Sequence, residues 1–129
     1  MRRKLPIFSL LILFFYYGCG TSKTISKVPI STYNITYKVI NNSSFKHLDA
    51  SYLDNYKKGV RIKDIVQPQV EVPIGLVTDG FIASISCTGY GAKDSLASIE
   101  LQIFQNGDMV VSNVVYGLNP SLAVSYVVE

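Results

Sequence analysis

From residue 33 onward, apolar and polar residues alternate with a period of two over much of the chain. Residues 33–39, Tyr-Asn-Ile-Thr-Tyr-Lys-Val, carry apolar side chains at every second position, which is typical of a β-strand that buries one face. The alternation returns at residues 70–72 and ends at Pro73, which cannot donate a ladder hydrogen bond and favours an edge or a strand end. One face of a further strand consists of Phe81, Ala83, Ile85 and Cys87.

Clusters of turn-forming residues separate the other candidate strands. Residues 41–44, Asn-Asn-Ser-Ser, precede a strand predicted over 47–53, because Asn and Ser favour turns. Residues 54–59 separate that strand from one over 60–66. A last strand is predicted over 122–128.

The clearest local pattern is a hairpin centred on Asn106-Gly107. Apolar residues alternate in 99–103 and return in 109–111 on its other side. Asn-Gly favours a two-residue hairpin loop because both positions tolerate positive φ. The predicted register is Gln105 opposite Asp108, Ile103 opposite Val110 and Ile99 opposite Val114.

About eight short strands, without a stretch of helical periodicity, predict an all-β fold. We expect a small antiparallel β-sandwich, immunoglobulin-like, with about seven or eight strands over residues 32–129. The chain has 129 residues, which leaves room for one such domain.

The first eighteen residues have a different pattern. A positive start, Met1 to Lys4, precedes the apolar run 7–17 and then Gly18-Cys19, which is the layout of an export signal. A helix of about 11 to 13 residues reaches about 20 Å, against about 30 Å of hydrocarbon, so a transmembrane helix is disfavoured. Gly18-Cys19 resembles the bacterial lipobox, which implies that residues 1–18 are a lipoprotein signal peptide and that Cys19 carries lipid, palmitate included. The alternative is an ordinary secreted protein that is cut elsewhere.

Residues 19–31 then comprise the lipidated Cys19 and a flexible tether. They are rich in Ser, Thr and Lys, with Pro29 near the end, and they lack an apolar period. A lipid on Cys19 would hold the domain at a membrane. Residue 20 is Gly, whereas Asp after the lipidated Cys favours inner-membrane retention in lipoprotein sorting. The resemblance therefore implies a bacterial envelope protein anchored in the outer membrane and facing the periplasm.

The charge of the chain lies in the same segment. Arg2, Arg3 and Lys4 account for the whole formal charge of +3. The mature chain is therefore formally neutral and lacks a field that attracts phosphate backbones. We expect no nucleic acid among its partners.

Candidate catalytic residues are scarce. His47 is the only histidine, so any Ser-His-Asp or Cys-His arrangement would need it. Asp49 would share its strand face, but a half-exposed histidine in a polar strand is the favoured interpretation. One His and one thiol are too few for zinc, and the segments 79–80 and 106–108 suit turns better than calcium loops. We therefore expect no enzyme, no metal and no cofactor.

Three other positions carry candidate chemistry. Cys87 lacks a partner once Cys19 is lipidated, and its strand position favours burial over reactivity. Tyr90, between two glycines, and Tyr116, before Gly117, are candidates for a binding surface, because tyrosine offers a large rigid contact area. A packed turn is the alternative for both rings. Residues 94–96, Asp-Ser-Leu, resemble a short acceptor motif for O-glycosylation at Ser95.

The order of these motifs resembles the MmpS family, the small accessory proteins of mycobacterial RND-type transporters. The resemblance covers most of residues 32–128 and rests on the opening strand 33–39, Val72-Pro73-Ile74, the hairpin 99–111 and the closing segment 123–126. It implies an immunoglobulin-type sandwich and a role beside a transporter. Members of the family are usually held by a transmembrane helix and often pair two cysteines, and this chain departs from both features.

The sequence thus predicts a membrane-anchored lipoprotein that acts as a non-enzymatic accessory or binding module, with an envelope protein as partner. The alternative is a periplasmic ligand-binding or chaperone-like lipoprotein that holds a glycan, lipid or peptide.

Overall fold

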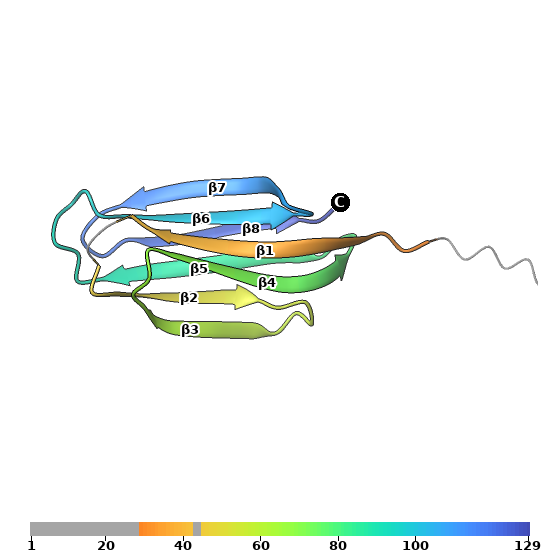
Figure 1. Cartoon of the computed structure of the whole chain (residues 1–129), viewed down its shortest axis with the longest axis horizontal. Coiled ribbons are helices and arrows are strands. Elements are labelled where there is room, and N and C mark those ends of the chain that lie inside the picture. The colour runs from red at the N-terminus through yellow and green to blue at the C-terminus, as the bar shows by residue number, and fades with distance from the viewer. Residues whose placement is uncertain (1–28, 43–44) are drawn as a thin grey trace, which may run out of the picture.

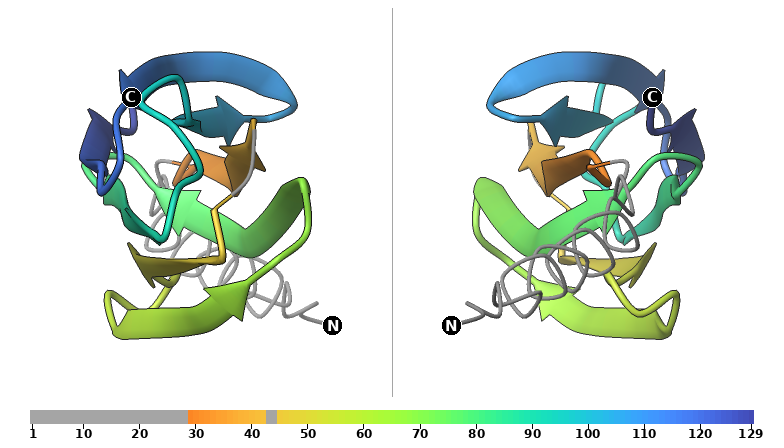
Figure 2. Two further views of the ribbon diagram at one scale, coloured as in Figure 1. Left: turned by 90° about the vertical axis from the view of Figure 1, so that its left-hand side faces the viewer. Right: turned by 90° about the vertical axis from the view of Figure 1, so that its right-hand side faces the viewer.

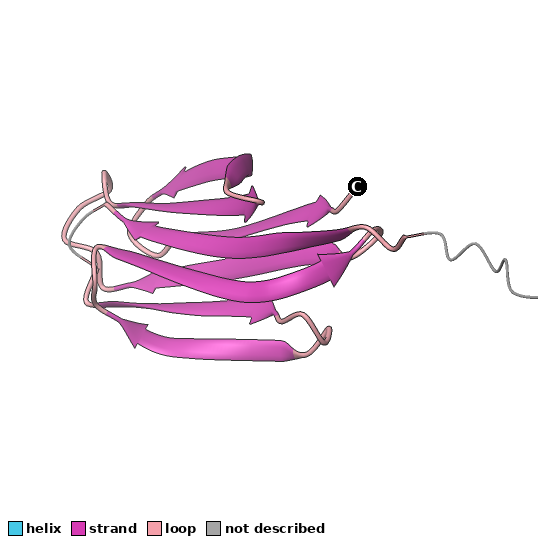
Figure 3. Cartoon of the chain, turned by 45° about the vertical axis from the view of Figure 1, so that its right-hand side comes forward, coloured by secondary structure: helices cyan, strands magenta, loops and turns pink. Residues whose placement is uncertain are grey.

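A computed structural model of the chain describes residues 29–42 and 45–129, which form two four-stranded antiparallel sheets packed face to face (Figure 1). Strands and loops make up these residues, without a helix among them (Figure 3). The predicted all-β sandwich is confirmed, whereas residues 1–18 lie outside the described part of the chain. The strands are β1 (Thr32–Asn41), β2 (His47–Leu53), β3 (Gly59–Ile65), β4 (Gln69–Thr78), β5 (Ile82–Tyr90), β6 (Ser98–Gln105), β7 (Asp108–Tyr116) and β8 (Ser121–Val127).

The two sheets have the strand orders β4-β1-β6-β7 and β3-β2-β5-β8. The pair β1-β4 and the series β3-β2-β5-β8 have the neighbours of immunoglobulin strands B and E and of strands C′, C, F and G. The hairpin β6-β7 lies beside β1, where immunoglobulin domains place strand A. The chain is therefore an immunoglobulin-like sandwich whose A position is filled by a hairpin inserted between the F-like and G-like strands.

The alternation of the sequence fills the space between the sheets. Every second residue along β5 is buried, and the face predicted from Phe81, Ala83, Ile85 and Cys87 is confirmed. In β6, Ile99, Leu101 and Ile103 are fully buried. Burial of such side chains contributes about 1.5–3 kcal/mol each, so these inner faces are the main stabilising element of the fold.

Tyr37 in β1 joins the two sheets by hydrogen bonds. Its hydroxyl donates to the Leu53 carbonyl at 2.9 Å and accepts from the Ser84 N–H at 3.1 Å. The register of β2 and β5 would make Leu53 and Ser84 the next opposed pair. The phenol therefore stands where a direct ladder hydrogen bond would otherwise form, and burial raises the pKa of Tyr37 to about 12.

The predicted strand end at Pro73 is corrected. Pro73 does not end its strand, because β4 continues through it to Thr78. A bulge allows this continuation: Ile35 pairs with Gly75 and Thr36 with Pro73, and Gly75 has φ +88°. The expected edge position is confirmed, since β4 is the outer strand of its sheet.

The hairpin turn is confirmed, but the register beyond it is wrong by one residue. Gln105 faces Asp108 as predicted, whereas Ile103 faces Val111 and Ile99 faces Val115 rather than Val110 and Val114. A bulge between Ile103 and Phe104 causes the shift. It allows the consecutive residues Val110 and Val111 both to pack against the core, which a regular strand would place on opposite faces.

The sandwich has two distinct ends. The described chain begins at the right of Figure 1, at the end of the domain that also holds the turn Asn106-Gly107 and the β4–β5 connection. We call this the proximal end. The opposite, distal end holds the β1–β2, β3–β4, β5–β6 and β7–β8 connections. Figure 2 views the distal end in its left panel and the proximal end in its right panel.

Candidate functional site

The two tyrosines predicted to form a binding surface lie at the same end of the molecule. Tyr90 is the last residue of β5 and Tyr116 the last of β7, and both strands point to the distal end (Figure 1). Their exposed fractions are 38% and 64%. They belong to different sheets, so the distal end presents one aromatic side chain from each layer of the sandwich.

The ring of Tyr90 stacks on the imidazole of His47. The register pairs these residues across β2 and β5, and their ring centroids lie 4.9 Å apart at an interplanar angle of 28°. The backbone also holds this corner, because the Lys46 N–H donates to the Tyr90 carbonyl at 2.9 Å. Tyr90 is therefore a partly exposed ring in a fixed position rather than a free loop side chain.

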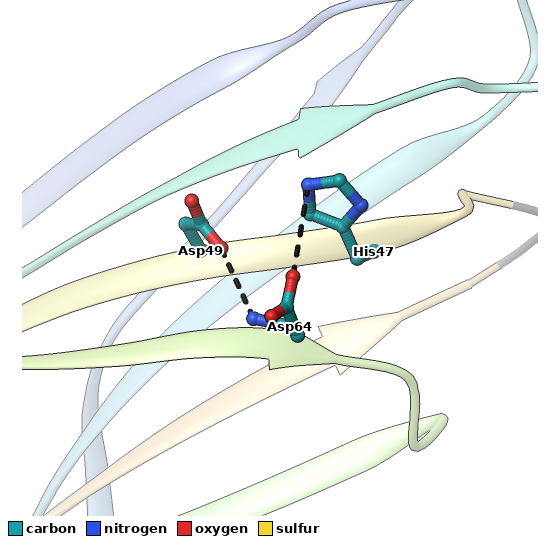
Figure 4. A group of neighbouring side chains, drawn as sticks. All are labelled: His47, Asp49 and Asp64. Atoms are coloured by element: carbon teal, nitrogen blue, oxygen red, sulfur yellow. Dashed lines mark hydrogen bonds and ion pairs between the residues drawn. The ribbon is translucent and has the colours of Figure 1, made fainter.

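Two carboxylates stand next to His47 on the outer face of the sheet (Figure 4). The His47 Nε2 lies 4.0 Å from Asp64 Oδ1, and the Asp64 N–H donates to Asp49 Oδ1 at 3.1 Å. Asp64 has a positive φ of 57° at the bulge of β3 against β2. Sequence reasoning predicted that His47 and Asp49 share a face, and the structure confirms it. It missed Asp64, because a bulge in β3 brings that residue into the group.

Asp49 already has two partners within the protein. Besides the Asp64 N–H at Oδ1, it pairs through Oδ2 with the Arg61 guanidinium at 3.4 Å. The backbone hydrogen bond from Asp64 lowers the pKa of Asp49, and the charges of Arg61 and His47 lower it further. Asp49 is thus ionised and neutralised locally.

His47, Asp49 and Asp64 form an incomplete set of metal ligands. One ligand atom each from His47, Asp49 and Asp64 lies within 4.8 Å of the others. A metal ion that used Asp49 beside His47 and Asp64 would compete with the positive charge of Arg61 for the same carboxylate. The arrangement suits hydrogen bonding to a polar partner beside an aromatic ring.

Two exposed leucines lie in the connections that flank Tyr116. Leu118 follows it by two residues and Leu96 precedes Ala97, and both are among the exposed large hydrophobic residues of the described chain. The Gly117 N–H donates to the Ala97 carbonyl at 2.9 Å, which links the β7–β8 connection to the β5–β6 connection. Sequence reasoning missed both leucines, because their exposure and the hydrogen bond that links the connection of Leu96 to that of Leu118 appear only in the folded chain.

Cys87 does not form a site with His47. Its thiol is buried between the sheets, as predicted, whereas His47 lies on the outer face of β2. Burial raises the pKa of Cys87 to about 12, and the negative charge of Asp49 adds to this shift. A thiol in this environment is protonated and unreactive at neutral pH.

Cys19, Ser95 and two predicted turns are the other positions singled out in the sequence. Cys19, the predicted lipid-attachment residue, lies outside the described residues. Residues 79–80 and 106–108 form turns, with Gly80, Asn106 and Gly107 at positive φ. Ser95 is exposed in a turn where Asp94 Oδ1 accepts the Leu96 N–H at 2.9 Å, and its glycosylation stays a prediction.

No protein-family model and no curated protein sequence matches this chain. Within residues 29–42 and 45–129, no helix is long and apolar enough to cross a membrane.

Proposed function

We propose that the chain is a non-enzymatic binding module of the bacterial envelope, anchored through a lipid on Cys19 and recognising a partner protein with its distal end. The position of Tyr90 and Tyr116 carries this proposal. Both rings are exposed at the end opposite to that where the described chain begins. A lipid anchor on the preceding segment would therefore leave this end free to meet a partner.

The reach of the chain before the domain fits this orientation. Pro29, the first described residue, follows Cys19 by ten residues, which span at most about 35 Å when fully extended. The domain would thus stay close to the membrane that holds the lipid, and its distal end would face the periplasm if the outer membrane carries the anchor.

The chemistry of the distal end suits recognition of a protein. This end presents the rings of Tyr90 and Tyr116, and the Arg61 guanidinium lies on the adjoining outer face, 3.4 Å from Asp49. Tyr and Arg are enriched among the residues that dominate protein interfaces. The carboxylate of Asp64 supplies a hydrogen-bond acceptor next to Tyr90. The resemblance to RND-transporter accessory proteins makes a transporter component the first partner to test.

A glycan ligand is the second candidate. The stacked pair of Tyr90 and His47 beside Asp64 favours it. A fixed aromatic ring can stack on a sugar ring, and the nearby carboxylates can accept hydrogen bonds from sugar hydroxyls. This interpretation corresponds to a periplasmic ligand-binding lipoprotein.

The anchor is tested by mass spectrometry of the mature N-terminus. We expect the wild-type chain and Cys87→Ser to start at a lipidated Cys19, and Cys19→Ala to give an unlipidated product that is uncleaved or cut elsewhere. An unmodified wild-type N-terminus would refute the lipoprotein proposal.

The recognition surface is tested by cross-linking in cells. We expect a defined adduct with an envelope protein, reduced at least about tenfold in Tyr90→Ala or Tyr116→Ala, which corresponds to about 1.4 kcal/mol of binding. Ser125→Ala, at an exposed outer-face position of β8 outside both ends, is the control and should leave the adduct unchanged. Undiminished adducts in both distal variants, or loss of folding in both, would contradict this assignment.

A further inference from the structure

Exposed large apolar side chains of the described chain gather at the two ends of the sandwich. Those at the proximal end have exposed fractions between 54% and 77%. They are Ile30, Tyr56, Leu76, Ile82, Met109 and Val127.

The strand register places these side chains around the whole proximal end. Ile82 in β5 pairs with Val127 in β8, which is the outer strand of its sheet. On the other sheet, Leu76 pairs with Asn34, and Met109 follows the hairpin turn. Tyr56 lies in the β2–β3 connection at the same end. The apolar side chains therefore form a rim shared by both sheets.

The outer faces between the two ends are polar. Lys38 pairs with Glu71 at 3.8 Å across β1 and β4. Glu100 accepts hydrogen bonds from Gln102 at 3.1 Å and from Ser112 at 2.9 Å. Exposed apolar side chains are thus concentrated at the two ends, and the apolar rim is the group at the proximal end.

A hollow of about 180 Å³ opens beside the rim, lined by Leu53, Lys57, Gly80 and Ile82. Its apolar lining and the ammonium group of Lys57 would suit the region of a bilayer where polar headgroups meet acyl chains. Acidic residues at the same end offset the two lysines of the β2–β3 connection, so attraction to anionic lipid is not the main interaction. The acidic residues are Asp54, Asp79, Asp108 and Glu129.

We propose that the proximal end rests on the lipid surface that carries the anchor, with Tyr56, Ile82 and Val127 inserted at headgroup level. This inference rests on the proposed lipidation of Cys19. The composition of residues 19–28 predicts a flexible tether, and ten residues of such a chain have a root-mean-square span of about 16–19 Å. This span would keep the proximal end near the bilayer at a high effective concentration. Tyrosine favours membrane interfaces because its ring is apolar and its hydroxyl polar. The contact would hold the domain upright, with Tyr90 and Tyr116 directed away from the membrane.

The chain contains no tryptophan, so a single introduced indole reports one position only. The Tyr56→Trp and Tyr116→Trp variants, purified as lipoproteins, are reconstituted into phosphatidylcholine vesicles with brominated acyl chains, which quench tryptophan fluorescence on contact. We expect at least threefold stronger quenching and a blue-shifted emission for Tyr56→Trp, and neither for Tyr116→Trp. Added Ile82→Ser and Val127→Ser substitutions should reduce the quenching of Tyr56→Trp at least twofold, and 0.5 M NaCl should leave it unchanged.

Equal quenching of the two tryptophan variants, or stronger quenching of Tyr116→Trp, would overturn this inference. A parallel sample separates it from the lipidation of Cys19. There, the chain from Cys19 onward is coupled through the Cys19 thiol to a maleimide phospholipid in the same vesicles, while Cys87 is protected by burial. Absence of lipid on the cellular protein, with normal quenching of the coupled Tyr56→Trp chain, would refute the proposed anchor and leave the lipid-binding rim supported. Circular dichroism confirms that each variant is folded.

Discussion

At the level of single residues, Tyr37 shows how one polar atom in the core holds two layers together. Its hydroxyl satisfies the Leu53 carbonyl and the Ser84 N–H, which lie on neighbouring strands of the opposite sheet. Without it, both part-buried groups would lose this partner, and an unsatisfied buried polar group costs about 1–3 kcal/mol. The alternation predicted the burial of Tyr37, but the two partners of its hydroxyl depend on where β2 and β5 separate.

Tyr37→Phe should therefore lower the free energy of unfolding by about 1–3 kcal/mol, measured by urea denaturation at pH 7. Because the folded pKa is about 12 and the ordinary value is 10.0, the unfolded chain loses its proton first as the pH rises. The stability of the wild-type protein should thus fall between pH 10 and pH 12, and Tyr37→Phe should lack this component. Tyr52→Phe is the control, since its ring lies 5.6 Å from that of Tyr37. An equal loss in both variants would contradict the role of the Tyr37 hydroxyl.

Asp49 gives the opposite dependence on pH. Its pKa lies below the ordinary value of 3.8, mainly because it accepts the Asp64 N–H. The stabilisation by Asp49 is therefore present above about pH 4 and is lost as the pH falls through the lower folded pKa. We expect Asp49→Asn to be less stable than the wild-type protein at pH 7, with a difference that shrinks below pH 4 in urea denaturation. Asp79→Asn is the control, and a difference independent of pH would refute this assignment.

At the level of elements, the sequence predicts strands well and their irregularities poorly. The period of two identifies β1 and β5 because a half-buried strand must alternate. The same period cannot show the bulge at Val110, because two adjacent valines satisfy either register. Pro73 predicted an edge correctly, yet the strand continues past it because an edge strand needs no N–H donor on its open side.

Gly89 in β5 lies in close contact with Phe45, in the connection that precedes β2. A Cβ atom at this position would lie 2.7 Å from the ring of Phe45, which is buried beneath the distal end. Gly89→Ala should therefore force the ring to move and lower the free energy of unfolding by about 1–3 kcal/mol. Gly59→Ala is the matched control, because a Cβ atom added at this position would have no other atom within 4 Å.

The contact is measured by a double-mutant cycle from urea denaturation. The Gly89→Ala substitution should cost at least about 0.5 kcal/mol less in a Phe45→Leu background than in the wild-type protein, because a smaller side chain leaves room for the methyl group. Additive effects of the two substitutions would show that the glycine is needed for another reason.

At the level of the whole molecule, the candidate site depends on topology that local sequence does not encode. The glycines beside Tyr90 and Tyr116 mark both tyrosines as candidates in the sequence, but their shared end follows from the directions of β5 and β7 in two different sheets. Asp64 joins His47 only through the pairing of β3 with β2 and its bulge. Local patterns thus identify residues able to bind, and the crossing connections decide which of them can act together.

The predicted organisation of the molecule, a tether followed by a sandwich, leads to a last prediction. Pro29, Ile30 and Ser31 are exposed, and β1 begins at Thr32 with its pairing to Thr78. If residues 19–28 only connect the domain to the lipid, residues 29–129 should unfold cooperatively in urea, with a free energy within about 0.5 kcal/mol of that of residues 19–129 carrying Cys19→Ala. Removal of the segment would then alter membrane attachment and leave folding intact. A loss above about 2 kcal/mol, or a non-cooperative transition, would show that residues 19–28 pack against the sandwich, and a flexible tether would no longer explain how the distal end is presented.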